Sequence, residues 1–250
     1  MIRLKSPEEI GLLRQANQLV GKLLQELSKQ VRPGVSTLEL DRLAEDYIRS
    51  HGAIPSFKGF HGYPNSICAS VNNVVVHGIP SAAQRLKEGD IISIDAGAKL
   101  NGYCGDSTIT VAVGDIDPQL AKLMRVTQEA LELGIGQARV GNRIGDIGYV
   151  MQKYVEEQGF SIVRHFIGHG VGKDMHEDPP VPSFGRKGTG PLIKEGLVIA
   201  IEPIVNIGDY DVEVLADGWT AVTRDGSFSA QYEHTVAVTG TGVEILSKVI

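Results

Sequence analysis

Cysteine is scarce in this 250-residue chain, which has only Cys68 and Cys104. Two cysteines cannot build a disulfide scaffold, and no C-x-x-C pair exists for a thiolate metal or redox site. Basic residues are too few for a nucleic-acid-binding face, because 24 lysines and arginines meet 30 aspartates and glutamates and the net charge is −6. No apolar run approaches a membrane span, and the first residues lack the apolar stretch of a secretory signal. We therefore expect a cytoplasmic protein that binds neither a specific nucleic acid nor a membrane.

The remaining composition is that of a globular protein, with 42% hydrophobic and 22% charged residues. Capping boxes at Ser6–Glu9 and Ser36–Glu39 predict two helices, and further helices are predicted from Asp117 onwards and over about 145–159. Strand-like runs follow the helices at 73–76, 90–94, 107–113, 197–201, 212–215 and 231–238. Helices followed by strands, twice, predict an α+β fold with a largely antiparallel sheet.

The two series of elements also match each other in sequence. At an offset of 107 residues, KEGDIISID (87–95) falls on KEGLVIAIE (194–202), so that Asp95 falls on Glu202. Glycines and tyrosines of the first half also fall on their own kind in the second. We interpret 1–250 as one catalytic domain with an internal repeat of about 8–110 and 115–217, whose halves are related by a pseudo-twofold axis.

Two aspartates occupy segments that are predicted to be buried strand. Asp95 follows an apolar run, and Asp106 comes eleven residues later, ahead of another. Asn101-Gly102 predicts a two-residue hairpin turn between them, which sets Asp95 opposite Thr108 and makes Asp106 its diagonal neighbour on the same face. Buried carboxylates so close together repel unless a proton or a cation lies between them.

Three further residues are candidates for the same cluster: Glu202 after Ile201, Glu233 in the run 230–236, and His169 among three glycines. Four carboxylates and one imidazole suit Mn, Fe, Co or Zn better than a thiolate-rich site would. One divalent ion cannot balance four acids, whereas two ions can. A two-metal site activates water and polarises a carbonyl group, which indicates a hydrolase.

With these residues in place, the sequence resembles the type I methionine aminopeptidases of the pita-bread fold, in metallopeptidase family M24. The resemblance covers nearly the whole chain. It rests on HGYPNSICASVNNVVVHGIP (61–80), IDAGAKLNGYCGDST (94–108), GHGVGKDMHEDP (168–179), IEP (201–203) and QYEHTV (231–236). It implies two pseudo-symmetric halves around a curved, largely antiparallel sheet, and removal of the initiator methionine from nascent proteins whose second residue is small.

The resemblance also implies a role for each matching residue. Asp95 is expected to bind one divalent ion, Asp106 and Glu233 to bridge both ions, and His169 and Glu202 to bind the other. Glu202 is also expected to move protons during the attack of water. The expected ions are two of Co, Mn, Fe or Zn.

Two further histidines are not ligands in the family. His77 and His176 are expected to flank the scissile peptide and to stabilise the developing oxyanion. The pocket for the methionine side chain is expected to include Phe60, Tyr63, Cys68, Met175 and Trp219, where Phe60 and Met175 depart from the residues usual in relatives. Asn72, Val74 and Ser229 match a monovalent-cation site of some relatives. The expected partner is the N-terminal peptide of a nascent protein, at the ribosome, bound by a monomer.

Other functions were weighed against this one. A proline-directed aminopeptidase of the same fold usually carries an additional N-terminal domain, whereas here the fold is predicted to begin within the first ten residues. A non-enzymatic peptide-binding module, or a metal-free acid–base enzyme, would hold no stoichiometric divalent ions. The type II methionine enzymes carry a long insertion before the last glutamate, but only thirty residues separate Glu202 from Glu233. Trp219 is as consistent with a core position as with the pocket.

Overall fold

The computed structural model describes residues 1–249. Within them the α-helices are α1 (Pro7–Gln30), α2 (Thr37–Ser50), α3 (Pro118–Gln137) and α4 (Ile144–Glu157), and one turn of 3₁₀ helix covers Phe60–Gly62. The predicted capping boxes are present, because the Ser6 and Ser36 hydroxyls accept the Glu9 and Glu39 amides while each glutamate returns the bond. These side chains satisfy amides that the first helical turn leaves unpaired, which fixes where both helices begin.

One nine-stranded sheet forms the centre of the molecule, in the order β1-β4-β5-β14-β9-β7-β8, with β2 beside β4 and β15 beside β14. Its strands are β1 (Ile54–Pro55), β2 (Ile67–Val71), β4 (Ile91–Leu100), β5 (Tyr103–Ala112), β7 (Gly168–Gly170), β8 (Glu177–Val181), β9 (Val198–Ile201), β14 (Glu233–Thr239) and β15 (Gly242–Ile245). Two three-stranded sheets, β13-β10-β6 and β11-β12-β3, complete the fold. Their strands are β3 (Val74–Val76), β6 (Ser161–Ile162), β10 (Ile204–Asn206), β11 (Val212–Val214), β12 (Ala221–Thr223) and β13 (Ser229–Gln231).

Every strand pairing described is antiparallel, as the sequence predicts. The β4–β5 hairpin turns at Asn101-Gly102 and sets Asp95 opposite Thr108, so the predicted register is confirmed. The strand predicted over 231–238 is interrupted, because it divides at Tyr232 into β13 and β14, which belong to different sheets. Tyr232 leaves the ladder: its amide donates to the Pro203 carbonyl and its hydroxyl to the Thr110 carbonyl.

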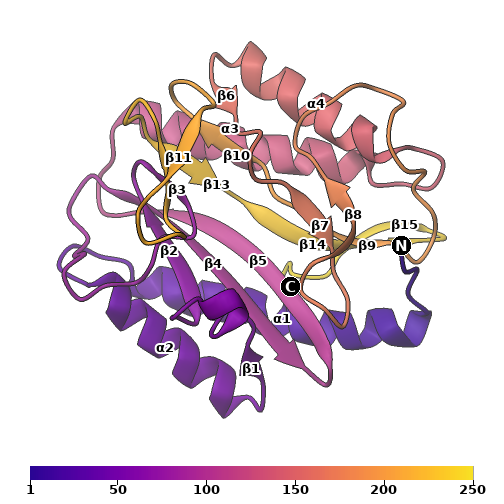
Figure 1. The fold of residues 1–250 in the computed structure, drawn as a ribbon, viewed down its shortest axis with the longest axis horizontal. Helices are drawn as coiled ribbons and strands as arrows, with labels where there is room; N and C mark the ends of the chain where they lie inside the picture. Colours follow the sequence, from indigo (N-terminus) through magenta and orange to yellow (C-terminus); the bar gives the residue numbers. More distant parts are fainter. Residues whose placement is uncertain (250) are drawn as a thin grey trace.

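Each pair of helices packs with its own strands. In Figure 1, α1 and α2 run along the lower part of the molecule and α3 and α4 along the upper part, with the strands between and in front of them. Leu23 and Leu27 of α1 share a buried cluster with Ile92 and Ile94 of β4. The corresponding cluster of α3 and α4 packs on residues of β9, including Ile199 and Ile201. The middle of the sheet therefore lies between two hydrophobic cores.

Elements of the two halves recur at the offset of 107 residues. Thr37–Ser50 of α2 corresponds in both its ends to Ile144–Glu157 of α4. The isolated bridge between Ser36 and Arg85 has its counterpart between Arg143 and Leu192. We propose that the halves are two copies of one unit inside a single domain.

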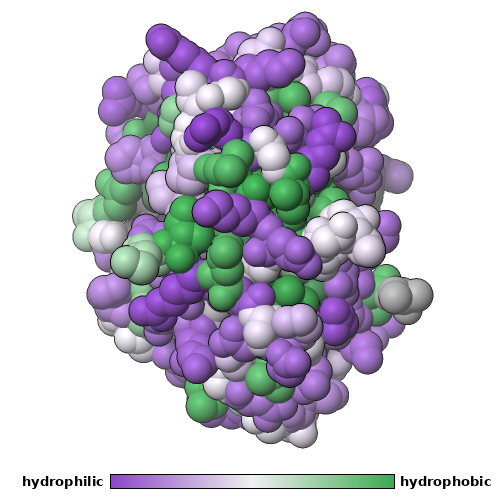
Figure 2. All heavy atoms as spheres, turned by 90° about the vertical axis from the view of Figure 1, so that its right-hand side faces the viewer, coloured by the Kyte–Doolittle hydropathy of each residue, from purple (hydrophilic) through white to green (hydrophobic). Residues whose placement is uncertain are grey.

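The outer surface is mostly polar. Figure 2 shows one face on which hydrophilic side chains predominate and surround an apolar patch near the middle. Within residues 1–249, none of the helices combines the length and the apolar character needed to cross a membrane.

Candidate metal centre

The β4–β5 hairpin brings its two aspartates to one cavity. Asp95 lies opposite Thr108 and Asp106 opposite Gly97, and both carboxyl groups line the same hollow. Asp106 is 3% exposed. Oδ1 of Asp95 and Oδ1 of Asp106 are buried and have no hydrogen-bond partner among the described residues. Buried carboxylate oxygens without donors are costly, so these two atoms indicate a missing cation or proton.

Two glutamates join the cluster from the neighbouring strands. β14 lies between β5 and β9, so Glu233 faces Thr108, whose Oγ1 donates 2.8 Å to Glu233 Oε2. Glu202 follows the last residue of β9 and accepts a hydrogen bond of 3.1 Å from Gln231 Nε2 at its Oε2. Each glutamate is therefore held at one oxygen by a neutral donor.

His169 closes the cluster from β7. Its Nε2 lies 3.5 Å from Asp106 Oδ2 and 3.9 Å from Glu202 Oε1. Its Nδ1 lies 2.9 Å from the Gly170 carbonyl oxygen, so Nδ1 carries a proton and Nε2 of the neutral ring presents a lone pair to the carboxylates. Glycine is required beside it, since a Cβ on Gly168 would lie 2.3 Å from the Ala200 carbonyl oxygen. Ligand atoms of Asp106, His169 and Glu233 lie within 4.8 Å of one another.

Burial and mutual repulsion govern the protonation of this cluster. Burial raises the pKa of Asp95 to about 7 and, with the Asp95 charge, raises the pKa of Glu202 to about 8. The pKa values of Asp106 and Glu233 are raised for the same reasons, with burial as the larger cause. Burial lowers the pKa of His169 to about 4, so the ring is neutral. Carboxylates and a neutral imidazole lone pair converge without cationic side chains, and this donor set fits divalent metal ions.

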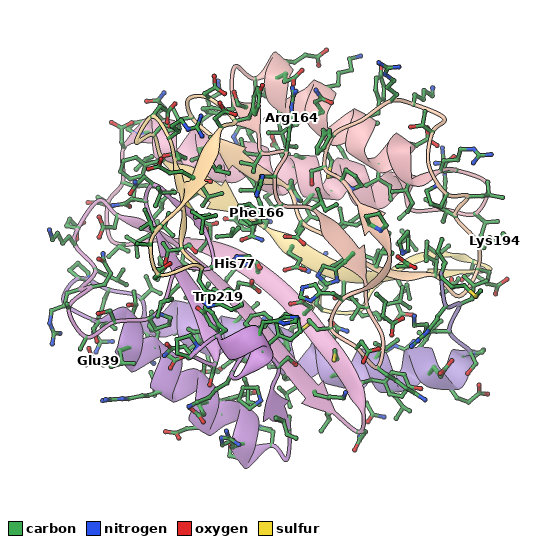
Figure 3. The ribbon with its side chains drawn as sticks, in the orientation of Figure 1. Glu39, His77, Arg164, Phe166, Lys194 and Trp219 are labelled. Carbon is green, nitrogen blue, oxygen red and sulfur yellow. The ribbon has the colours of Figure 1, made fainter. Side chains whose placement is uncertain are left out.

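The cluster lies against a cavity of about 270 Å³ with aromatic walls. His77, held at a φ of 58°, packs edge-on against Phe166 at 5.3 Å and against Trp219 at 6.2 Å between ring centroids. Figure 3 shows these three side chains gathered near the centre of the molecule, from different segments of the chain. The His176 ring lies 4.2 Å from that of His169 and 5.3 Å from that of Phe60. The two histidines therefore stand at the cavity beside the carboxylate cluster.

Most of the expected pocket residues line this cavity. Phe60, Tyr63, Cys68 and Trp219 do so, and the Tyr63 hydroxyl is engaged by the Ile67 and Gly78 carbonyls, 3.1 Å away each. Burial raises the pKa of the Cys68 thiol well above its usual value, so the thiol is neutral and acts as part of the apolar wall.

Met175 is not among the residues that line the cavity. It is 6% exposed and packs with Phe57, and a Cβ on Gly97 would lie 2.3 Å from its Cε. It lines a neighbouring hollow instead. Its place in the pocket was expected from its position beside His176, but its side chain turns toward the β4–β5 hairpin.

Several lining residues were not singled out as pocket residues from the sequence. They are Phe57, Val76, His165, Phe166, Ile167 and Gln231. Phe166 and Ile167 immediately precede the glycine-flanked His169, and an apolar pair before such a motif was the available signal.

The residues of the expected monovalent-cation site lie near the start of β3. The Asn72 carbonyl accepts the Ser229 amide at 2.9 Å, and Val74 begins β3. The Asn72 side chain is held by Asp90 and by the Ile91 amide. This cation site stays a prediction.

Comparisons with known proteins agree with this geometry. The model of metallopeptidase family M24 matches residues 11–240. Methionine aminopeptidase 1 of Bacillus subtilis is 52% identical over the full length of both chains. The crystal structure of methionine aminopeptidase from Thermotoga maritima superposes with a TM-score of 0.98 at 43% identity, covering all of both chains. The prolidase of Pyrococcus furiosus shares the fold, with a TM-score of 0.81 at 24% identity over 99% of this chain and 66% of its own. The chain belongs to metallopeptidase family M24, whose members use divalent metal ions to cleave peptides.

Proposed function

We propose that this protein is a metal-dependent aminopeptidase that removes the N-terminal methionine from chains whose second residue is small. The observation that carries the proposal is the cluster of four carboxyl groups and a neutral histidine at the wall of an enclosed, partly aromatic cavity. Relatives that match along the whole chain are named methionine aminopeptidases, which supports methionine as the residue removed.

The ligand set of the proposed centre is Asp95, Asp106, His169, Glu202 and Glu233. Four acidic groups favour two divalent ions over one, because two ions balance the charge of the ionised cluster. We assign Asp95 to one ion, His169 and Glu202 to the other, and Asp106 and Glu233 to both. When bound, such ions act as Lewis acids toward a carbonyl oxygen and lower the pKa of water.

The remaining chemistry belongs to side chains of this chain. Glu202 is the proton carrier of the proposal: its Oε2 is held by Gln231, while its Oε1 faces the cluster. His77 and His176 have pKa values lowered by burial, to about 4 for His77, so both rings are neutral at neutral pH. A neutral imidazole N–H can donate to a carbonyl oxygen whose negative charge grows during the reaction.

The aromatic wall provides the side-chain specificity. Phe60, Tyr63, Cys68 and Trp219 offer apolar surface to an unbranched, polarisable methionine side chain, which adapts to irregular pockets. We keep Met175 in the proposal only as a support beneath His176. Bulk in the second residue of the substrate would meet His77 and His176, so we expect small second residues.

The partners of the proposal follow from its substrate. New chains carry an initiator methionine as they leave the ribosome in the cytoplasm, and we place the protein there. One copy of the chain supplies every ligand and wall residue named here, which favours a monomer.

The test is methionine release from Met-Gly-Met-Met by metal-stripped protein after Mn²⁺, Co²⁺, Fe²⁺ or Zn²⁺ is added back. We expect metal-dependent release, its loss in Asp106→Ala, and its retention in Asp46→Ala, which removes an exposed aspartate of α2. A peptide that begins Met-Leu should be cleaved poorly.

Three other results would contradict the proposal. Cleavage of Xaa-Pro peptides in preference to Met-Gly would identify a proline-directed peptidase. A folded protein that takes up no divalent ion would favour a peptide-binding module. Release that is independent of metal would identify an acid–base enzyme.

A further inference from the structure

The backbone of Asp106 lies where two strands of the main sheet part. β5 pairs with β14 at Ser107 and Thr108, opposite His234 and Glu233, and the recorded pairing ends there. Two side chains continue the hydrogen bonding in place of the ladder. The Asp106 amide donates 3.1 Å to Asn17 Oδ1, and the Asp106 carbonyl oxygen accepts 2.8 Å from Thr235 Oγ1. Both backbone polar groups of this candidate ligand are thus held by side chains.

Asn17 reaches Asp106 from the buried face of α1. It is 0% exposed, and its Nδ2 donates 2.9 Å to the Leu13 carbonyl oxygen, which fixes the orientation of the amide group. Close approach of the helix depends on Gly105, because a Cβ there would lie 2.5 Å from the Ala16 carbonyl carbon and oxygen. The absence of a side chain at residue 105 brings Asn17 within reach of the strand.

Thr235 reaches Asp106 from the opposite side. It is 0% exposed and lies in β14, two residues after Glu233, so both side chains leave the same face of the strand. One hydroxyl therefore connects the strand that carries Glu233 to the residue that carries the other proposed bridging carboxylate.

We propose that Asn17 and Thr235 are positioning residues that set the place of the Asp106 carboxylate in the metal centre. The inference rests on the proposed function, since it takes Asp106 as a metal ligand. Groups that orient metal ligands typically change metal affinity by about 10–100-fold when they are removed. The same change is expected here, without loss of any ligand atom.

The experiment compares two threonine-to-valine substitutions, each of which removes one buried hydroxyl with little change of shape. Thr235→Val is the test. Thr127→Val is the matched control, because Thr127 is also 0% exposed and its Oγ1 donates 2.8 Å to the Leu123 carbonyl oxygen within α3, in the other half. Mn²⁺ affinity is measured by isothermal titration calorimetry on metal-stripped full-length protein, with the thermal midpoint measured beside it.

We expect both substitutions to lower the thermal midpoint, but only Thr235→Val to weaken Mn²⁺ binding, by about tenfold. Thr235→Ser restores the hydroxyl and is expected to restore the affinity. If Thr235→Val does not fold, Asn17→Ser is titrated in the same way and the same weakening is expected.

The inference is overturned if Thr235→Val binds Mn²⁺ within twofold of Thr127→Val. If the unsubstituted protein binds Mn²⁺ but releases no methionine, the proposed function fails, and the comparison of the two valine variants still decides the inference. No Mn²⁺ binding by the unsubstituted protein would overturn both.

Discussion

A buried ion pair connects the start of the chain to the segment that carries His176. Lys5 Nζ lies 2.7 Å from Glu177 Oε2, and the two side chains are 5% and 6% exposed. Lys5 Nζ also donates 2.8 Å to the Arg3 carbonyl oxygen. Lys5→Met keeps the length of the aliphatic side chain but leaves the Glu177 carboxylate buried without its closest cation.

Removing one member of a buried pair typically costs about 3–5 kcal/mol of unfolding free energy. We expect the lower end, about 3 kcal/mol, because Arg3 Nη1 lies 4.0 Å from Glu177 Oε1 and partly replaces the lost charge. For a chain of this size, each kcal/mol lowers the thermal midpoint by about 2–4 °C, so a fall of about 6–12 °C is expected. Urea unfolding followed by circular dichroism measures the free energy directly.

The matched control is Arg14→Met. Arg14 Nε lies 2.6 Å from Glu244 Oε1, but these side chains are 44% and 38% exposed, and an exposed pair contributes about 1 kcal/mol or less. The double variant Lys5→Met/Glu177→Gln should recover part of the loss, because no charge is left unpaired. Equal losses in Lys5→Met and Arg14→Met would refute the claim that burial makes the Lys5–Glu177 pair important.

Three further predictions concern pH, packing and metal. Burial opposes ionisation of Glu177, but the hydrogen bond and charge of Lys5 outweigh it and lower its pKa in the folded state; the resulting stability is therefore present above the unfolded pKa of about 4.3 and is lost as pH falls through the folded value. Glu177→Gln should abolish this component, so the difference in urea midpoint between it and the unsubstituted protein should shrink between pH 7 and pH 3. Gly105→Ala places a Cβ 2.5 Å from the Ala16 backbone and should destabilise by about 1–3 kcal/mol, whereas Gly102→Ala meets no neighbouring atom; a larger loss for Gly102→Ala in urea titrations would contradict the packing argument. Mn²⁺ at a hundred times its dissociation constant should stabilise the stripped protein by about 2.7 kcal/mol, and an equal gain in Asp106→Ala would show that the ion binds elsewhere.

Much of the fold was predictable where local chemistry determines it. Ser6 and Ser36 mark helix starts because their hydroxyls satisfy amides that have no other partner. Asn101-Gly102 determines the β4–β5 register because both residues adopt positive φ, 51° and 83°, in a tight turn. That register in turn fixes Asp95 and Asp106 as neighbours. These elements need only residues close in sequence.

Other elements depend on contacts that no local pattern contains. Gly168–Gly170 and Ile54–Pro55 are too short and too rich in glycine or proline to be read as strands, and they exist because longer strands pair with them. The alternating run at 231–238 predicts one continuous strand, but Tyr232 bonds to the Pro203 and Thr110 carbonyls and breaks it. Met175 lies beside His176 in sequence, yet the small Gly97 draws its side chain away from the cavity.

The site itself arises where the two halves stop being alike. Asp95 and Glu202 occupy matching positions at the offset of 107 residues, in β4 and directly after β9. β4 continues to Leu100 and returns as β5, which supplies Asp106, whereas β9 stops at Ile201 and Pro203 has no amide to extend a ladder. β14 from the end of the chain then pairs with both β5 and β9 and supplies Glu233. The repeat alone would bring two carboxylates together; the hairpin in one half and the late strand beside the other bring four. Four carboxylates on buried strands conflict with every local rule for a stable sheet, and such a conflict is expected where function requires it.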